Sequence, residues 1–498
     1  MTLNPDNPQW ELLERYEVIE TRTIKEKLTK EEITVVTGIN CPNLAELILN
    51  ELDLHFITTY DNQEIYVYQN GYYIPKGEPI IQEYVELFLQ ENCKEHYKKE
   101  VLGYIRDKNY KDRDIFNSKK YLINLKNGIY DVKHNKFIKH TPDCFFLSQL
   151  PIEYNNKIKI KEIKKFLKQT LNTDDIKRLQ EIFGYCLYRD YHIQKAFMFL
   201  GNGANGKSTV LNLLKTMLGS KNVSSLSLQE LCENRFAPAN LHTKLVNIYP
   251  DLPDKTLTKT GMFKILTGGD PISAEQKFKS HFNFINYAKL IFSANKLPET
   301  RDDTNAFFRR WEFINFPNTF YGDKCNPRIL EKLITDKELS GLFNWSLTGL
   351  RRLLRNGRFT NSSGVDEMRE KYQRLSSPVA SFVMDCIEIR PEKYIIKDEL
   401  YDCFVEYCVK NGLPATPKNT FSMKLHEHIK VVDYRPSISG KRVQCWMGIG
   451  FAASSDMSRL SGYLDYFYRT DTCESELKYK NNIDNPDGID KQEELNVK

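Results

Sequence analysis

The chain has 498 residues, which is enough for about three domains if one domain takes roughly 150. Hydrophobic residues make up 41% and aromatic residues 12%, so the chain has enough apolar surface to offset the entropy lost on folding and is not a disordered polymer. The 71 basic and 66 acidic residues nearly balance. A nucleic-acid surface must therefore be a local patch rather than a property of the whole chain.

Cysteine usage and apolar patterning predict where the protein works. The 11 cysteines include no CxxC pair, which argues against a zinc ribbon and against a secreted disulfide framework. No run approaches about 18 uninterrupted apolar residues, and MTLNPDNPQW lacks the basic and apolar regions of a signal peptide. We therefore expect a soluble, cytoplasmic protein without a membrane partner.

The first 190 residues divide into two predicted modules. Residues 1 to 100 mix short β-like runs such as EIYVYQ with a helical segment near 83 to 102, which makes an α+β region of unclear role. Residues 101 to 190 form a hairpin and helical module, with Asn127-Gly128 as a two-residue turn between YLINL and IYDV. Apolar residues at helical spacing from 159 to 190 predict a helical connector.

Residues 191 to 320 predict an α/β core. Three short apolar strands alternate with helix-like stretches, which is typical of a mainly parallel sheet covered by helices on both faces. The strands are AFMFL at 196 to 200, KLVNIY at 244 to 249 and AKLIFSA at 288 to 294.

The remaining sequence predicts three parts. Residues 321 to 377 form a helical lid or linker with Gly357 as a helix C-cap. Residues 378 to 452 contain helices and then a hairpin with Ser439-Gly440 at its tip, as in a winged-helix module. Residues 453 to 498 are polar and acidic without apolar periodicity, which predicts disorder.

The most specific motif is GNGANGKS, a complete GxxxxGK[ST] between a predicted strand and a predicted helix. In such a loop, backbone N–H groups surround phosphates, the lysine reaches the β and γ phosphates, and the Ser208 hydroxyl binds Mg²⁺. The stretch also fits the GxGxxG pattern of a dinucleotide site, but such a site has no use for Lys207. We expect ATP and Mg²⁺, held by Gly201, Asn202, Gly203, Ala204, Asn205, Gly206, Lys207, Ser208 and Thr209.

Three downstream features suit an ATPase. Asp251 ends the strand LVNIYPD, where a carboxylate holds Mg²⁺ and orients the attacking water, and the alternative is a solvated turn acid. Asn295 follows AKLIFSA, where an amide beside the γ phosphate positions water, although a plain asparagine turn fits too. Arg309 and Arg310 lie among aromatic residues. A guanidinium there stabilises a transferring phosphate, and the alternative is a pair of arginines flanking a buried strand.

The order of these motifs resembles a known family. GNGANGKST, NIYPDLPD, LTGGDPISAEQKFK, KLIFSANKLPE and DTNAFFRRWEFINFP together are similar to the superfamily 3 helicases, which are AAA+ ATPases. Within them, the chain looks like the C-terminal part of phage and plasmid primase-helicases, related to the poxvirus replication helicase. The likeness is close over residues 195 to 320 and looser upstream to about 100, where LINLKNGIYDV and QLPIEYN lie.

This resemblance implies an ATP-dependent replicative DNA helicase of a virus, plasmid or other mobile element, acting in the host cytoplasm. It implies a homo-hexameric ring with ATP between subunits, single-stranded or forked DNA in the channel, and 3′ to 5′ movement. By position it assigns Lys207 and Ser208 to the first motif, Asp251 to the second, Asn295 to the third, and Arg309 or Arg310 to the arginine supplied to the neighbouring ATP.

Between the second and third motifs this family places a β-hairpin whose lysine contacts DNA. The corresponding segment here is SAEQKFKSHF, with Lys277, Phe278 and Lys279. Lysines neutralise phosphates and a ring stacks on bases, so this tip suits a contact that follows the DNA backbone. A solvated hairpin is the alternative.

Two departures from the family pattern limit the assignment. Many relatives carry a second acid in the second motif, whereas Asp251 stands between Pro250 and Leu252, so the residue that polarises the water stays open. Many also fuse a primer-synthesising domain, which needs clustered carboxylates for metal ions. Residues 1 to 100 offer only Asp61 and isolated glutamates. We expect priming by a separate primase or initiator; the alternatives are a primase-helicase component and a P-loop NTPase switch without unwinding activity.

The predicted winged-helix module carries its own basic residues. Lys418 and Lys424 fall on a helix after Thr416-Pro417, and Lys441 and Arg442 follow the hairpin tip. This layout is typical of a recognition helix with a basic wing, although such modules also bind proteins.

Overall fold

The computed structural model describes residues 9–25, 32–52, 54–275, 277, 281–322, 326–438 and 440–452. It divides into two compact units, Met1–Tyr372 and Gln373–Lys498, so the boundary falls within the predicted linker at 321 to 377. In these described ranges, no helix has the length and apolar character needed to cross a membrane. Phe278, Lys279, Ser439 and the tail from 453 to 498 lie outside the described residues.

A five-stranded sheet forms the centre of the first unit, and all its strands are parallel. This confirms the predicted parallel α/β core and adds strands that the sequence pattern did not resolve. The order across the sheet is β11 (Val223–Ser224), β12 (Val246–Tyr249), β15 (Lys289–Ala294), β10 (Ala196–Leu200) and β16 (Trp311–Asn315).

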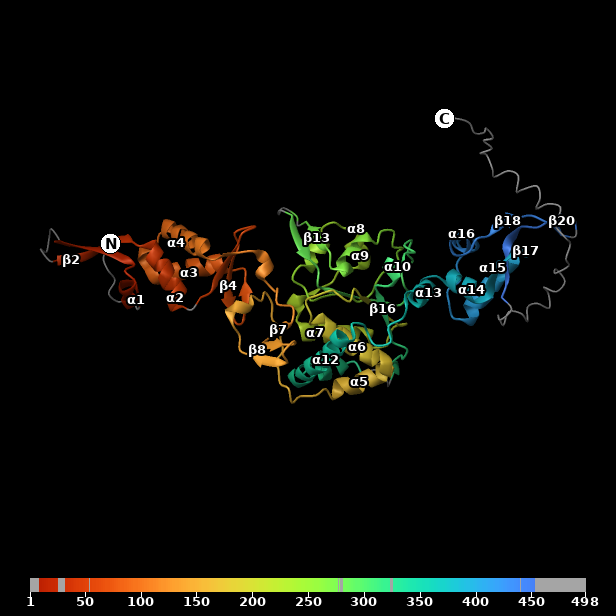
Figure 1. Cartoon of the computed structure of the whole chain (residues 1–498), viewed down its shortest axis with the longest axis horizontal. Helices are drawn as coiled ribbons and strands as arrows, with labels where there is room; N and C mark the ends of the chain where they lie inside the picture. The colour runs from red at the N-terminus through yellow and green to blue at the C-terminus, as the bar shows by residue number, and fades with distance from the viewer. Residues whose placement is uncertain are drawn as a thin grey trace, which may run out of the picture. The chain divides into compact units, whose positions relative to one another are not determined.

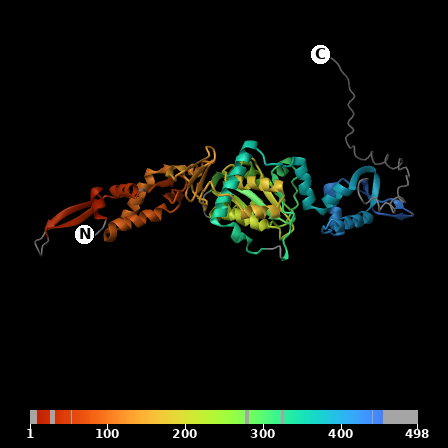
Figure 2. The same ribbon diagram turned by 90° about the horizontal axis from the view of Figure 1, so that it is seen from below.

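The inner strand β10, between β15 and β16, is buried on both sides, and its side chains alternate between two cores. Phe197 and Phe199 belong to one core, whereas Ala196, Met198 and Leu200 belong to the other. In Figure 1 helices lie on either side of the sheet, and Figure 2 shows one helical layer in front of it. The first core takes α5 (Glu162–Thr170), α6 (Thr173–Cys186), α7 (Lys207–Leu218), α11 (Ile329–Leu333) and α12 (Asp336–Asn356), and the second takes α8 (Leu228–Glu233), α9 (Gly261–Gly268), α10 (Asn305–Phe308) and α13 (Val365–Ser376).

The N-terminal part of the first unit contains helices packed on short strands. The single helical segment predicted near 83 to 102 is two helices, because the backbone turns at Gln90, where φ is +46°. The elements are α1 (Trp10–Arg15), β1 (Ile19–Lys25), β2 (Glu32–Ile39), α2 (Cys41–Glu51), β3 (Phe56–Thr59), β4 (Ile65–Gln69), β5 (Tyr72–Ile74), α3 (Gly77–Leu89), α4 (Glu95–Lys108) and β6 (Tyr110–Lys111).

The predicted hairpin around residue 127 forms, but its turn is shifted by one residue. Leu125 pairs with Gly128, so the turn is residues 126 and 127 rather than Asn127-Gly128. This register sets Ile123 opposite Tyr130 with both in the core, and a slip of one residue would reverse the faces. The three strands are β7 (Leu122–Leu125), β8 (Gly128–Asp131) and β9 (Lys136–Ile138).

Residues 378–438 and 440–452 of the second unit form three helices around an aromatic core, with a three-stranded antiparallel sheet. Phe404 and Phe421, from two different helices, lie with ring centroids 4.6 Å apart. The elements are α14 (Pro378–Cys386), β17 (Ile387–Ile396), α15 (Lys397–Lys410), α16 (Lys418–His428), β18 (Val432–Tyr434), β19 (Ser437–Ile438), β20 (Lys441–Arg442) and β21 (Cys445–Phe451).

Candidate nucleotide-binding site

The glycine-rich loop connects the C-terminal end of β10 to the first residue of α7. Gly206 has φ of +87°, and a Cβ there would lie 2.9 Å from Cγ2 of Thr170, so both conformation and space require glycine. The backbone N–H of Phe320 donates to the carbonyl oxygen of Ala204 over 2.7 Å and holds the outer side of the loop. The loop therefore meets the positive end of α7 in a fixed geometry suited to an anion.

Lys207 turns back over the loop and is only 6% exposed. Its Nζ donates to the Gly201 carbonyl oxygen and to Asn295 Oδ1, the latter over 3.1 Å. With the Asn205 amide oxygen facing the ammonium, that oxygen also accepts from Nζ at 3.1 Å. Burial lowers the pKa of Lys207, and the nearby Asp251 carboxylate opposes this shift. An ammonium held this way is ready to exchange its neutral acceptors for phosphate oxygens.

Asp251 and Asn295 come together because their strands are neighbours. They follow the C-terminal ends of β12 and β15, and the N–H of Leu252 donates to the Ser293 carbonyl oxygen over 2.8 Å. Both side chains are exposed, as is Ser208 at the start of α7. The hydroxyl of Ser208 and the carboxylate of Asp251 are hard oxygen donors of the kind that Mg²⁺ prefers. Predicted parts of three separate motifs thus lie around one loop.

The two arginines of the predicted fourth motif have different environments. Arg310 is buried, and it donates from Nε to Thr267 Oγ1 over 2.9 Å and from Nη1 to the Ala306 carbonyl oxygen. Burial lowers its pKa, and the adjacent Arg309 lowers it further. Arg309 is exposed, and its guanidinium has no hydrogen bond or ion pair to any residue that the structure describes. Arg310 therefore supports the fold, whereas Arg309 is free to bind a ligand.

Arg309 lies at the opposite end of the strands from the loop, because it precedes β16 whereas the loop follows the neighbouring strand β10. The N–H of Ala196, the first residue of β10, donates to the Arg310 carbonyl oxygen over 2.6 Å. The loop begins after the last residue of the same strand, five residues on, a span of roughly 16 Å. Arg309 is therefore well separated from the loop of its own chain.

The structure also contains a buried lysine that the sequence argument did not single out. Lys289, the first residue of β15, is 0% exposed, and its Nζ donates to the carbonyl oxygens of Tyr188 and Tyr287, each over 2.7 Å. The ring centroids of Tyr185 and Tyr191 lie 4.3 and 5.1 Å from Nζ. Burial lowers the pKa of Lys289 to about 7. Its signal in the sequence was a lone lysine in the otherwise apolar strand AKLIFSA.

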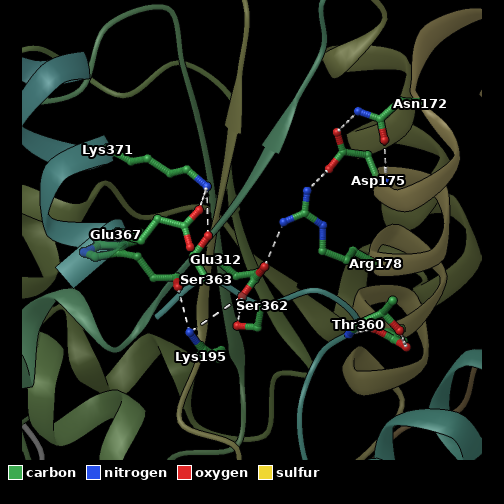
Figure 3. A network of polar contacts seen from close by, with 12 residues as sticks. Asn172, Asp175, Arg178, Lys195, Glu312, Thr360, Ser362, Ser363, Glu367 and Lys371 are labelled. Carbon is green, nitrogen blue, oxygen red and sulfur yellow. Dashed lines mark hydrogen bonds and ion pairs between the residues drawn. The ribbon is translucent and has the colours of Figure 1, made fainter. Parts of the chain in front are cut away.

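A second buried charge fixes β16, the strand that follows the two arginines. Glu312 is 0% exposed and accepts from Arg178 of α6 over 3.1 Å and from Ser362 over 2.7 Å, with Lys195 Nζ at 3.6 Å. Figure 3 shows Arg178 between Glu312 and Asp175. The network ties the strand after Arg309 to the helix layer on the sheet, and nothing in the sequence pattern pairs these residues.

The predicted DNA-contacting segment is a hairpin, formed by β13 (Pro271–Ala274) and β14 (Phe282–Ile285). Lys277 is exposed near its tip. Glu275, two residues earlier, forms an ion pair with Arg235 over 3.2 Å. An exposed lysine on a hairpin that projects from the sheet suits a contact with a phosphate backbone.

The four basic residues predicted to contact DNA from the C-terminal unit are not equivalent. Lys418 is exposed but forms an ion pair with Asp398, and Lys424 is half-buried. Lys441 and Arg442 form β20 and are both exposed. The small hairpin therefore offers more accessible positive charge than the helix before it.

Three family models match this chain. The D5 N terminal like model matches residues 44–172, and the Poxvirus D5 protein-like model matches residues 375–455. Between them, a family of unknown function, DUF5906, matches residues 199–310, which include the loop and both arginines. Two of the three models thus show that the chain is similar to the poxvirus D5 proteins over residues 44–172 and 375–455.

Several viral proteins resemble this chain over part of their length. It is 25% identical over 366 residues to putative helicase 121R of invertebrate iridescent virus 3, covering 64% of this chain and 38% of that one. It is 27% identical over 215 residues to putative helicase L207/L206 of Acanthamoeba polyphaga mimivirus, covering 40% and 22%. It is 26% identical over 217 residues to primase D5 of fowlpox virus, covering 40% and 27%. The chain thus spans between 22% and 38% of the length of these three curated proteins.

Among solved structures, the A form apo structure of the NrS-1 C terminal region aligns with 81% of the present chain. The alignment covers 98% of the NrS-1 chain, with 13% identity and a TM-score of 0.45. A second apo structure of the same region aligns with 82% and 98%, with 13% identity and a TM-score of 0.46.

Proposed function

We propose that this protein is an ATP-dependent DNA helicase of the superfamily 3, AAA+ type, which acts in viral or mobile-element replication. The observation that carries the proposal is the meeting of Lys207 and Asn295 over 3.1 Å, with the Asp251 carboxylate close enough to oppose the lowered pKa of Lys207. A phosphate loop, a metal-binding acid and a water-positioning amide are the parts that ATP hydrolysis requires.

In this mechanism, Lys207 and the loop backbone bind the β and γ phosphates. Ser208 and Asp251 would hold Mg²⁺, which would supply positive charge to the phosphates. Asn295 orients the attacking water. Arg309 of a neighbouring copy stabilises the charge of the transferring phosphoryl group. Within its own chain, Arg309 lies at the N-terminal end of the strands, away from the loop at their C-terminal end. A ring of copies, which we take to be a hexamer, satisfies this requirement at every site.

DNA enters the proposal through the hairpin and the second unit. The exposed Lys277 belongs to the hairpin between the second and third motifs, and Lys441 and Arg442 are exposed in the second unit. We assign Lys277 to the DNA backbone in the ring and the winged-helix-like second unit to double-stranded DNA near the fork. Relatives named as putative helicases support this assignment.

The test is ATP turnover by the full chain with and without single-stranded DNA, together with unwinding of a forked duplex. We expect DNA to stimulate turnover and ATP to drive strand separation. ATP turnover that DNA leaves unchanged, with no unwinding of forks of either polarity, would show a nucleotide switch instead.

The fowlpox relative named as a primase supports a second candidate, in which this chain takes part in primer synthesis. Incubation with single-stranded DNA and labelled ribonucleotides distinguishes the two. Primer synthesis that survives Lys207→Ala would assign the chain a priming activity apart from the phosphate loop.

A further inference from the structure

The turn that presents Arg309 is too short to hold itself in place. Arg309 follows α10, which has only four residues, and an isolated helix of that length is unstable in water. The direction of the Arg309 side chain therefore depends on the groups that clamp α10 from outside.

One clamp comes from α9. Asp302, three residues before α10, accepts from Lys264 Nζ over 2.8 Å, from the Thr260 hydroxyl, and from the backbone N–H of Thr304 over 3.0 Å. Together, these bonds fix the start of the turn but do not touch the residues next to Arg309.

The second clamp comes from α13, more than 60 residues later. Nη2 of Arg369 donates to the Asp303 carbonyl oxygen over 3.0 Å and to Asn305 Oδ1 over 2.5 Å. The guanidinium carbon lies 5.4 Å from the ring centroid of Phe308, the residue directly before Arg309. Arg369 thus contacts the α10 turn at its start, through two hydrogen bonds, and at Phe308, through the ring, so it restrains both ends of the turn.

A tyrosine on the same helix supports this contact. The ring of Tyr372 is 0% exposed and packs against Phe307 and Phe308 at centroid distances of 5.3 and 5.7 Å. Its hydroxyl donates to the Pro298 carbonyl oxygen over 2.8 Å. These contacts hold α13 against α10, so a change in the position of Arg369 would also move the α10 turn.

We propose that Arg369 is a positioning residue for Arg309: it orients the α10 turn so that the Arg309 guanidinium faces the ATP of a neighbouring copy. The inference rests on the proposed function. It assigns a role to a residue outside all the ATPase motifs, and it makes the geometry of α13 a determinant of turnover.

The main experiment compares Arg369→Ala with Lys371→Ala in the full chain. Lys371 lies on the same helix but contacts Glu367 and Ser363 instead of α10 (Figure 3), which makes it a matched control. We expect Arg369→Ala to assemble and bind ATP like the unaltered chain, with KM unchanged and kcat lower by about tenfold to a hundredfold, because a misplacement of roughly 1 Å costs that much. Lys371→Ala should keep full turnover. Equal turnover in the two variants would overturn the proposal.

Three further readouts separate positioning from general support of the fold. The double variant Arg309→Ala with Arg369→Ala should turn over no more slowly than Arg309→Ala alone, because both changes remove one interaction. Asn305→Ala, which removes the acceptor on α10, should reproduce the loss even if Arg369→Ala folds poorly. Mixing Arg369→Ala with Lys207→Ala should restore activity, because the first keeps an intact loop and the second an intact Arg309.

A double variant slower than Arg309→Ala, a normal Asn305→Ala, or an inactive mixture that still co-assembles would each refute the positioning role. If the unaltered chain does not hydrolyse ATP, or if Arg309→Ala has no effect, the proposed function itself fails. A loss in Arg309→Ala without a loss in Arg369→Ala refutes this inference alone.

Discussion

Lys207 Nζ and Asn295 Oδ1 share a hydrogen bond of 3.1 Å, although the two residues stand 88 positions apart. The bond joins the first residue of α7 to the residue that follows β15, so it crosses between two neighbouring strands of the central sheet. The asparagine amide oxygen gives the buried ammonium an acceptor. A γ phosphate would replace that acceptor and release the amide to bind water.

Lys207→Ala should abolish most ATP hydrolysis, because the γ phosphate loses the charge that stabilises its transfer. Turnover and nucleotide affinity are measured on protein whose circular dichroism matches that of the unaltered chain. Near-normal turnover in this variant would remove the loop from the catalytic site.

Arg309→Ala and Arg310→Ala should fail in different ways. Arg309 is exposed, so its loss should leave the free energy of unfolding within about 0.5 kcal/mol and lower turnover on the order of 10³-fold. Arg310→Ala should lose about 2 to 3 kcal/mol, because a buried charged donor to Thr267 disappears. Urea unfolding and turnover are measured on both, and the reverse pattern would exchange the two roles.

Lys277→Ala should weaken single-stranded DNA binding and reduce the slope of log affinity against log salt by about 0.7, the value for one phosphate contact. Basal ATP hydrolysis without DNA should persist. The matched control is Lys259→Ala, an exposed lysine placed before α9 rather than on the hairpin. If both variants change the slope equally, the hairpin has no special contact.

The buried Lys289 should make stability depend on pH. Its pKa is about 7 in the folded chain against an ordinary 10.5, so between these values the unfolded chain binds the extra proton and the free energy of unfolding rises with pH. Comparison with Lys289→Met isolates this group from the others. From about pH 7 to pH 9 the unaltered chain should gain roughly 2 kcal/mol more than the variant. Parallel curves for the two proteins would show that Lys289 stays charged, held by the two carbonyl oxygens and the tyrosine rings.

Glu312→Gln should destabilise the first unit by about 3 kcal/mol, because it leaves Arg178 and Lys195 without their shared buried carboxylate. Glu367→Gln, an exposed glutamate in the same view of the molecule (Figure 3), should leave the unfolding midpoint unchanged. Midpoints in urea decide the matter. Equal midpoints for the two variants would mean that water reaches the Glu312 network and replaces its contacts.

The sequence by itself determined the local features whose signals are local. Glycine at 206 followed by Lys207 predicted the loop and the start of α7, and the apolar runs AFMFL and AKLIFSA predicted two central strands. The arginine pair was also visible, whereas Lys289 in the strand AKLIFSA was not singled out. Such patterns arise from backbone freedom and side-chain burial within a few residues, and a single sequence carries both.

Only the tertiary structure decided which distant residues meet. The order of the strands places Asn295 beside Lys207. The length of β10 separates Arg309, at one end of the strand, from the loop at the other end. The structure also buries Arg310 against Thr267 and seats Arg369 on the α10 turn, although adjacent arginines look alike in the sequence. Strand order and long-range packing set these contacts, because each depends on how the whole sheet and its helix layers assemble and not on neighbours along the chain.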